Sequence, residues 1–230
     1  MAFATRIDYF NQAANAVIEL VASAANKAYA VNLTGQSERG DVIARDLGGL
    51  REAPTCDFVV KAAGNLVIEL GAIHTITTSI YCLLGLSIAT KAATAPTVQM
   101  SGESLQEAAT VSSTVTVPTI ALSALHKAQI LASAFTLSGA GCKLTECNLE
   151  VKANLTRATK DGDTLAHDVS GASITVSGKV IQTGATAPTI AAAEGWTLTQ
   201  PATSTDPDEG YTEWSFECTK DLESVEPSGE

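Results

Sequence analysis

The residues of this chain that could carry acid–base chemistry are three scattered histidines, His74, His126 and His167. His167 stands directly before Asp168, and an adjacent carboxylate can raise the pKa of an imidazole. Successive residues of a strand point to opposite faces, however, so Asp168 is poorly placed to orient His167. His74 and His126 have no partner at a suggestive spacing. We interpret His167 as a loop or packing residue, and we do not expect the chain to be an enzyme.

Two acidic turns and five cysteines are the candidates for metal binding. Asp161 and Asp163 flank Gly162 as at the start of a calcium loop, but no Glu follows at the spacing that closes such a loop. The turn at 206–210 could hold a cation weakly. The cysteines form no CxxC pair and have no histidine at zinc-ligand spacing; they are Cys56, Cys82, Cys142, Cys147 and Cys218. We expect solvated turns, buried reduced thiols, and neither a metal nor a cofactor.

The charge of the chain restricts its partners. Of the formal net charge of −11, −8 falls within residues 206–230. Binding to nucleic acid through phosphate neutralisation needs clustered Lys and Arg, so no sequence-specific nucleic-acid partner is expected. The longest apolar neighbourhood, residues 80–89, is too short to span a bilayer, and no signal peptide is visible. We expect synthesis in the cytoplasm and no membrane partner. GxSxG, Walker and GxGxxG motifs are absent.

The elements that must position these residues are predicted to be mainly β-strands. The chain is 45% hydrophobic and 17% charged, which is typical of a folded protein. One flanking helix is predicted at about 122–135, where Ser123 can serve as the N-cap of a broad apolar stripe. Residues 35–49 read as a charged loop punctuated by glycines. The pattern therefore predicts β-sandwich or barrel-like units with a single helix.

Two landmarks recur in order along the chain and indicate an internal duplication. The segment 55–62, TCDFVVKA, returns 91 positions later as ECNLEVKA at 146–153. The segment 88–97, IATKAATAPT, returns 92 positions later as VIQTGATAPT at 180–189. Self-similarity of this kind is typical of a repeated structural unit. We predict a first β unit at 1–110 and a second at 111–230, with Cys56 and Cys147 at equivalent buried strand positions.

The clearest alternation of the chain lies near its acidic end. Residues 211–218, YTEWSFEC, alternate between aromatic or apolar and polar side chains. This period of two predicts a strand with one buried face. Trp214, Phe216 and Cys218 would occupy the buried face, and Glu213 and Glu217 the opposite one.

The second half of the chain resembles a tailed-bacteriophage virion protein, most similar in style to tail tube and tube-like subunits. The resemblance covers roughly residues 110–225 and is carried by the segments 149–162, 173–181 and 211–222. It implies a β-sandwich with one flanking helix and long loops that lock hexameric rings into a tube for DNA passage. It also implies an acidic lumen, a homo-oligomer with other virion proteins as partners, and localisation in the virion.

Other functions remain open at this stage. The duplication is a departure from a simple tube subunit and leaves room for a trimeric hub-like ring of tandem domains or a capsid decoration protein. A carbohydrate-binding β-sandwich would need an exposed aromatic platform, and Trp196 and Trp214 are the two tryptophans available. Homo-oligomerisation is expected in any case, because long Thr-, Ser- and Val-rich strands need their edges covered.

Overall fold

Strands dominate the computed structural model of this chain. It describes residues 6–12, 14–36, 42–91, 94–105, 110–111, 113–122, 134–160, 163–183, 188–206 and 210–224. Over these ranges there is no helix, and the prediction of a mainly β fold is confirmed. Residues 123–133 of the predicted helix lie outside the described residues. Its two ends, Leu122 and Phe135, lie in short strands, Ile120–Leu122 (β10) and Phe135–Ser138 (β11).

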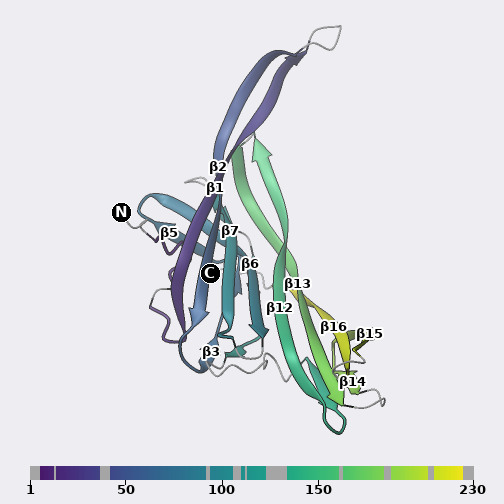
Figure 1. The fold of residues 1–230 in the computed structure, drawn as a ribbon. Coiled ribbons are helices and arrows are strands. Elements are labelled where there is room, and N and C mark those ends of the chain that lie inside the picture. Colours follow the sequence, from purple (N-terminus) through teal and green to yellow (C-terminus); the bar gives the residue numbers. More distant parts are fainter. Residues whose placement is uncertain are drawn as a thin grey trace.

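Eight strands form a continuous path through one large sheet. Their bounds are Ile18–Gln36 (β1), Val42–Val60 (β2), Ser79–Lys91 (β6), Thr97–Leu105 (β7), Lys143–Lys160 (β12), Asp163–Thr183 (β13), Thr197–Asp206 (β15) and Tyr211–Glu223 (β16). In space their order is β1-β2-β7-β6-β12-β13-β16-β15, and every neighbouring pair on this path is antiparallel (Figure 1). The β6–β12 pairing joins the two halves of the chain in one sheet, and the domain boundary near residue 110 stays a prediction.

The two faces of this sheet differ in chemistry, as alternating strands require. One row across all eight strands is apolar and mostly buried: Leu20, Phe58, Val98, Ile88, Leu149, Val176, Cys218 and Leu198. The adjacent row is mostly polar and exposed: Glu19, Val59, Thr97, Ala89, Asn148, Ser177, Glu217 and Thr199. We call the side of the first row the inner face and the side of the second row the outer face.

Short strands complete the hydrophobic core against the inner face. They are Gly64–Leu66 (β3), Glu69–Leu70 (β4), Val115–Thr116 (β9) and Thr189–Ala192 (β14), which pair as β3–β10, β4–β9 and β11–β14. Two more strands join the main sheet, Ile73–Ile76 (β5) beside β6 and Thr110–Val111 (β8) beside β13. The small strands and the inner face share one buried cluster, in which the rings of Phe135 and Phe216 lie 4.6 Å apart.

Two long hairpins extend from the sheet toward the same side of the molecule (Figure 1). In the first, β2 pairs with β7 over Thr55–Val59, so residues 25–36 and 42–54 pair only with each other. In the second, β12 pairs with β6 up to Lys152 and β13 pairs with β16 from Gly171 onward. We call residues 25–36 with 42–54 the first arm, and residues 153–160 with 163–170 the second arm. The predicted loop at 35–49 is wrong for 35–36 and 42–49, which are strand; residues 37–41 lie outside the described residues.

The repeated sequence segments do not share the same strand pairing. Cys56 and Cys147 are both fully buried on central strands, as predicted. Cys56 lies between Ser23 of β1 and Met100 of β7, whereas Cys147 lies between Thr90 of β6 and Gly178 of β13. The matched strands β12 and β13 pair directly, but β7 separates β2 from β6. The two cysteine positions are therefore not equivalent in their neighbours, because the second copy makes a hairpin where the first inserts a strand.

Candidate functional surface

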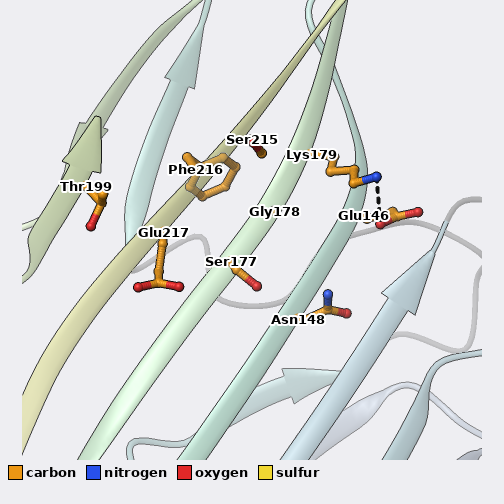
Figure 2. Close-up of a pocket in the computed structure, with 9 residues that line it drawn as sticks. All are labelled: Glu146, Asn148, Ser177, Gly178, Lys179, Thr199, Ser215, Phe216 and Glu217. Carbon is orange, nitrogen blue, oxygen red and sulfur yellow. Dashed lines mark ion pairs between the residues drawn. The ribbon is translucent and has the colours of Figure 1, made fainter. Parts of the chain in front are cut away.

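The outer face carries a hollow over the second half of the sheet. Figure 2 shows Asn148, Ser177 and Glu217 in one row on β12, β13 and β16 at this hollow. The hollow has a volume of about 360 Å³, and Lys179 and Glu146 border it. Small hydroxyl and amide side chains here are a direct result of the alternation, since their neighbours along each strand point into the core.

A second hollow lies on the same face over the first half of the sheet. Its volume is about 620 Å³, and residues of β1, β2, β6 and β7 line it. Gln99 at its edge donates a hydrogen bond through Nε2 to Asp57 Oδ1 at 2.7 Å. Val21 is 47% exposed at its rim. Both hollows are open depressions of one polar sheet surface, and neither encloses a group of titratable side chains suited to catalysis.

A ladder of alternating charges crosses the outer face. Lys91 Nζ on β6 lies 3.0 Å from Glu146 Oε1 on β12. Lys179 Nζ on β13 lies 3.8 Å from Glu146 Oε2 and 3.5 Å from Glu213 Oε1 on β16. On β12 itself, Lys152 Nζ lies 2.8 Å from Glu150 Oε1. These partly exposed pairs add little to stability individually, but they neutralise three lysines of the face.

Carboxylates outnumber lysines on this face. Glu217 and Glu19 form no ion pair with a described residue. The carboxylates of the outer face include Glu19, Asp57, Glu146, Glu150, Glu213, Glu217, Asp221 and Glu223, and its lysines include Lys91, Lys143, Lys152 and Lys179. The surface is therefore polar with a net negative charge, which disfavours adhesion of polyanions.

The strand predicted at 211–218 is confirmed within β16. Phe216 and Cys218 are buried, and Glu217 is exposed on the opposite face. Glu213 shares the face of Glu217 but is only half-exposed, since it is paired with Lys179. Trp214 packs partly buried against the core cluster, and Trp196 does the same. The two tryptophans therefore do not form an exposed aromatic platform.

The candidate acid–base residues are not brought together. His74 lies edge-on to Phe10, with ring centroids 6.0 Å apart, and burial lowers its pKa. His167 of β13 lies opposite Arg157 of β12. The neighbouring Asp168 accepts a hydrogen bond from Ser113 Oγ at 2.8 Å. His126 and Asp161 lie outside the described residues, as do residues 207–209 of the acidic turn. Across the ranges that are described, no three His, Cys, Asp or Glu residues cluster as metal ligands, and no helix is long and apolar enough to cross a membrane.

The cysteines are free thiols, and four of the five are buried. Burial raises the pKa of Cys56 to about 11 and that of Cys82 to about 12. Both thiols are therefore protonated at neutral pH and are poor nucleophiles. The expectation of buried, reduced cysteines is confirmed for Cys56, Cys82, Cys147 and Cys218, while Cys142 is half-buried.

A cluster of side chains around the carboxylate of Glu52 holds the first arm where it leaves the sheet. Lys27 of β1 lies opposite Glu52 of β2, with Nζ 2.7 Å from Oε1. The hydroxyl of Tyr81 donates a hydrogen bond to Glu52 Oε2 at 3.0 Å. The ring of Tyr81 packs edge-on against that of Tyr9, with ring centroids 5.0 Å apart. The backbone N–H of Glu52 also donates to Ser104 Oγ at 2.8 Å. The ion pair with Lys27, assisted by Tyr81, lowers the pKa of Glu52 despite the opposing effect of burial.

The second arm is held by the hydroxyl of Ser113 and by a close backbone approach at Gly171. Ser113 Oγ lies 2.8 Å from both Asp168 Oδ1 and the carbonyl oxygen of Val169, and its single hydroxyl proton is shared between these two acceptors. Gly171 stands where β13 begins to pair with β16, and a Cβ there would lie 2.8 Å from the carbonyl oxygen of Leu222. The β12–β13 register shifts between Asn154 and Leu155, next to this glycine. The arm thus begins at a bulge that a larger residue would disturb.

No protein-family model matches this chain, and no curated protein sequence matches it significantly.

Proposed function

We propose that the protein is a non-enzymatic virion structural protein, the subunit of a phage tail tube or tube-like ring that forms a DNA conduit. The observation that carries this proposal is the outer face, a polar surface spanning eight strands with excess negative charge and, in its described residues, no cluster of potential metal ligands. A subunit that lines a conduit must present a smooth, non-adhesive wall to the passing DNA. Small Thr, Ser and Asn side chains interspersed with carboxylates have this character.

The charge distribution supports this proposal for the second half of the sheet. Lys179, the cation nearest to Glu217 along the outer rows, is shared by Glu146 and Glu213. It therefore offers little free positive charge to a DNA phosphate. Charges act over about 8–10 Å at physiological salt. Glu217, directly on the sheet surface, would repel DNA at the wall itself.

A carbohydrate-binding β-sandwich is less well supported. Such a site uses an exposed aromatic surface for stacking on a sugar ring, together with a few oriented polar groups. Trp196 and Trp214 pack instead against the hydrophobic cluster. The hollow near Glu217 is lined by one aromatic residue, Phe216, whose side chain is 4% exposed.

Assembly tests this function most simply. The purified chain should sediment as a complex far larger than its 23.7 kDa monomer, and negative-stain microscopy should show rings or tubes with a central channel. A monomer at high protein concentration, with no rings at any salt concentration, would refute the proposal. Closed particles without a channel would favour a decoration protein instead.

A further inference from the structure

We propose that residues 6–12, which we call the N-terminal strap, form a latch on the inner face of the sheet that opens when His74 of β5 takes up a proton. Opening uncovers the start of β1 and the part of the inner face where β6 begins and β7 ends. The latch is a regulatory element of the subunit. The proposed conduit function does not require it, so the two can be tested separately.

The strap is anchored by two aromatic rings. Phe10 is fully buried and Tyr9 is 8% exposed. A Cβ at Gly102 of β7 would lie 2.8 Å from Phe10 Cε1, so the ring of Phe10 rests directly on this glycine. The ring of Tyr9 packs edge-on against Tyr81 of β6. Burial of these two rings is the main contribution that keeps the strap in place.

Polar contacts of the strap with the sheet are few. Arg6 Nη1 donates to the carbonyl of Leu20 at 3.2 Å, and the N–H of Ile7 donates to Ser23 Oγ at 2.9 Å. The thiol of Cys56 points to the carbonyl of Ile7, with Sγ 3.6 Å from the oxygen. No described residue of the strap belongs to a strand, whereas β5 pairs with β6 over all four of its residues. The strap is therefore the element that yields first when their contact is disturbed.

His74 supports the anchor of the strap. Its ring lies edge-on to that of Phe10, with centroids 6.0 Å apart, and it stands opposite Tyr81 in the β5–β6 pairing. Its Nε2 atom is buried and has no hydrogen-bond partner among the described residues. A neutral imidazole tolerates this position with a bare nitrogen. An imidazolium carries an N–H at both nitrogens, so protonation places an unpaired, charged donor in the core. Relief requires the His74 ring to leave Phe10, and the strap then loses its support.

The groups that face His74 offset this penalty only in part. The strap contributes the carboxylate of Asp8, which favours the protonated ring. β6 contributes the phenol of Tyr81, whose hydroxyl is directed to Glu52 of the first arm. β7 contributes Ser104, which stands opposite Tyr81 in the β6–β7 pairing and does not titrate. Burial outweighs the effect of Asp8 and lowers the pKa of His74 from its ordinary value of 6.5.

The direction of the pH response follows from this balance. Because the pKa of His74 is lower in the closed latch than in the open one, the closed latch binds fewer protons. Its stability is fully present above pH 6.5 and is lost as the pH falls toward the lower, closed-state pKa. The pKa values of Tyr9 and Tyr81 are raised above 10.0 and that of Glu52 is lowered below 4.5, so these neighbours keep their charge near neutral pH.

Hydrogen–deuterium exchange of the full chain at two pH values tests the latch. Protection factors, from which the chemical dependence of exchange on pH has been divided out, report how often the strap opens. Between about pH 7.5 and about pH 5.5, the protection of the peptide 6–12 should fall several-fold, up to the limit of about tenfold for one group whose open-state pKa is 6.5. The peptide 146–152 of the central strand β12 is the internal control and should keep its protection.

Two kinds of variant separate His74 from other titrating groups. His74→Phe should show the same strap protection at both pH values, because phenylalanine takes up no proton. His74→Gln is a second uncharged replacement, in case the first variant does not fold. His167→Gln removes a histidine from the second arm, opposite Arg157, and should keep the response of the wild type.

Equal strap protection at both pH values in the wild type would overturn the latch, whatever the variants do. A pH response that survives in the His74 variants, or one that disappears in His167→Gln, would overturn it as well. Each of these results leaves the conduit function standing, because that function is judged by rings or tubes and not by the strap.

Discussion

The first arm is fastened to the sheet by charged and aromatic side chains, whereas the second arm is fastened by a hydroxyl and by backbone geometry. Glu52 gathers Lys27, Tyr81 and the hydroxyl of Ser104 at the first root. At the second root, Ser113 bridges two positions of β13 and Gly171 fits against a backbone carbonyl. Both roots direct a long hairpin to the same side of the molecule (Figure 1).

This difference shows two physical ways of holding a hairpin beyond the core. An ion pair depends on the protonation of its carboxylate, so the first root should respond to pH. A close backbone approach depends on volume, so the second root should respond to the size of the side chain at one position. Variants at each root can therefore separate charge from volume.

The largest effect is expected from Gly171→Ala at the second root. The added Cβ would lie 2.8 Å from the carbonyl oxygen of Leu222, which belongs to β16 and cannot rotate away. The strain should lower the free energy of unfolding by about 2 kcal/mol, within the range for overpacked sites. Urea denaturation measures this change. Gly210→Ala is the control, because a Cβ there has no neighbour within 4 Å, although its φ of +69° adds a modest backbone cost. Equal losses in both variants would contradict the close-approach account.

A smaller effect, and one that depends on pH, is expected from Glu52→Gln at the first root. Hydrogen bonds to a charged group contribute about 1.5–3 kcal/mol, so this variant should lose about 1.5 kcal/mol at neutral pH. Folding lowers the pKa of Glu52 below its ordinary value of 4.5, so its stabilisation is fully present above that pH. It is lost as the pH falls through the lower, folded-state pKa. Denaturation series at several pH values should therefore show the two proteins converging below pH 4.5.

The control for this prediction is Glu19→Gln on the neighbouring strand β1. Glu19 is exposed and forms no ion pair with a described residue, so its loss should change stability by about 0.5 kcal/mol or less. If Glu52→Gln and wild type differ by the same amount at every pH, the ion pair does not hold the first arm.

The hydroxyl of Ser113 should contribute less than the Glu52 cluster. Ser113→Ala removes the hydrogen bonds to Asp168 and to the buried carbonyl of Val169, at an expected cost of about 1 kcal/mol. Thr114→Val is the matched control, because it removes a hydroxyl bond from the next residue to the exposed Glu69. Thermal denaturation should show a clear loss for the first variant and nearly none for the second. Equal melting temperatures would show that Ser113 does not fasten the second arm.

The smallest effect on stability, but a clear effect on DNA, is expected from Glu217→Lys on the outer face. Glu217 is exposed, so the change should alter stability by about 0.5 kcal/mol or less. The assembled protein should acquire measurable DNA affinity at low salt, or virions carrying it should eject DNA more slowly. Glu194→Lys makes the same charge change at an exposed site between β14 and β15, away from the outer rows. Equal DNA binding by both variants would contradict a conduit lined by the outer face.

Local alternation was enough to predict the β character and the orientation of one strand. Within β16, Phe216 and Cys218 point inward and Glu217 outward because a period of two admits no other placement on a one-sided sheet. Which strands pair with one another could not be predicted from local alternation. The repeat around Cys56 and Cys147 suggested that the matched segments pair alike, yet β12 pairs directly with β13 whereas β7 lies between β2 and β6, a long-range choice that no local pattern encodes.

The arms were missed for a related reason. Residues 42–49 carry charges and two adjacent glycines, which locally favour a loop, but pairing with β1 keeps them extended. These residues are extended because they pair with β1, and not because of their own β propensity. Similarly, Lys27, Glu52 and Tyr81 are far apart in sequence, so nothing in the order of residues predicted the cluster at the first root.

A reconstruction of the assembled protein by electron cryo-microscopy tests the central claim most directly. It should show a closed ring whose channel is lined by the outer face of the main sheet, with Asn148, Ser177 and Glu217 directed toward the axis. An assembly that turns this face away from its axis, or that has no axial channel, would contradict the account.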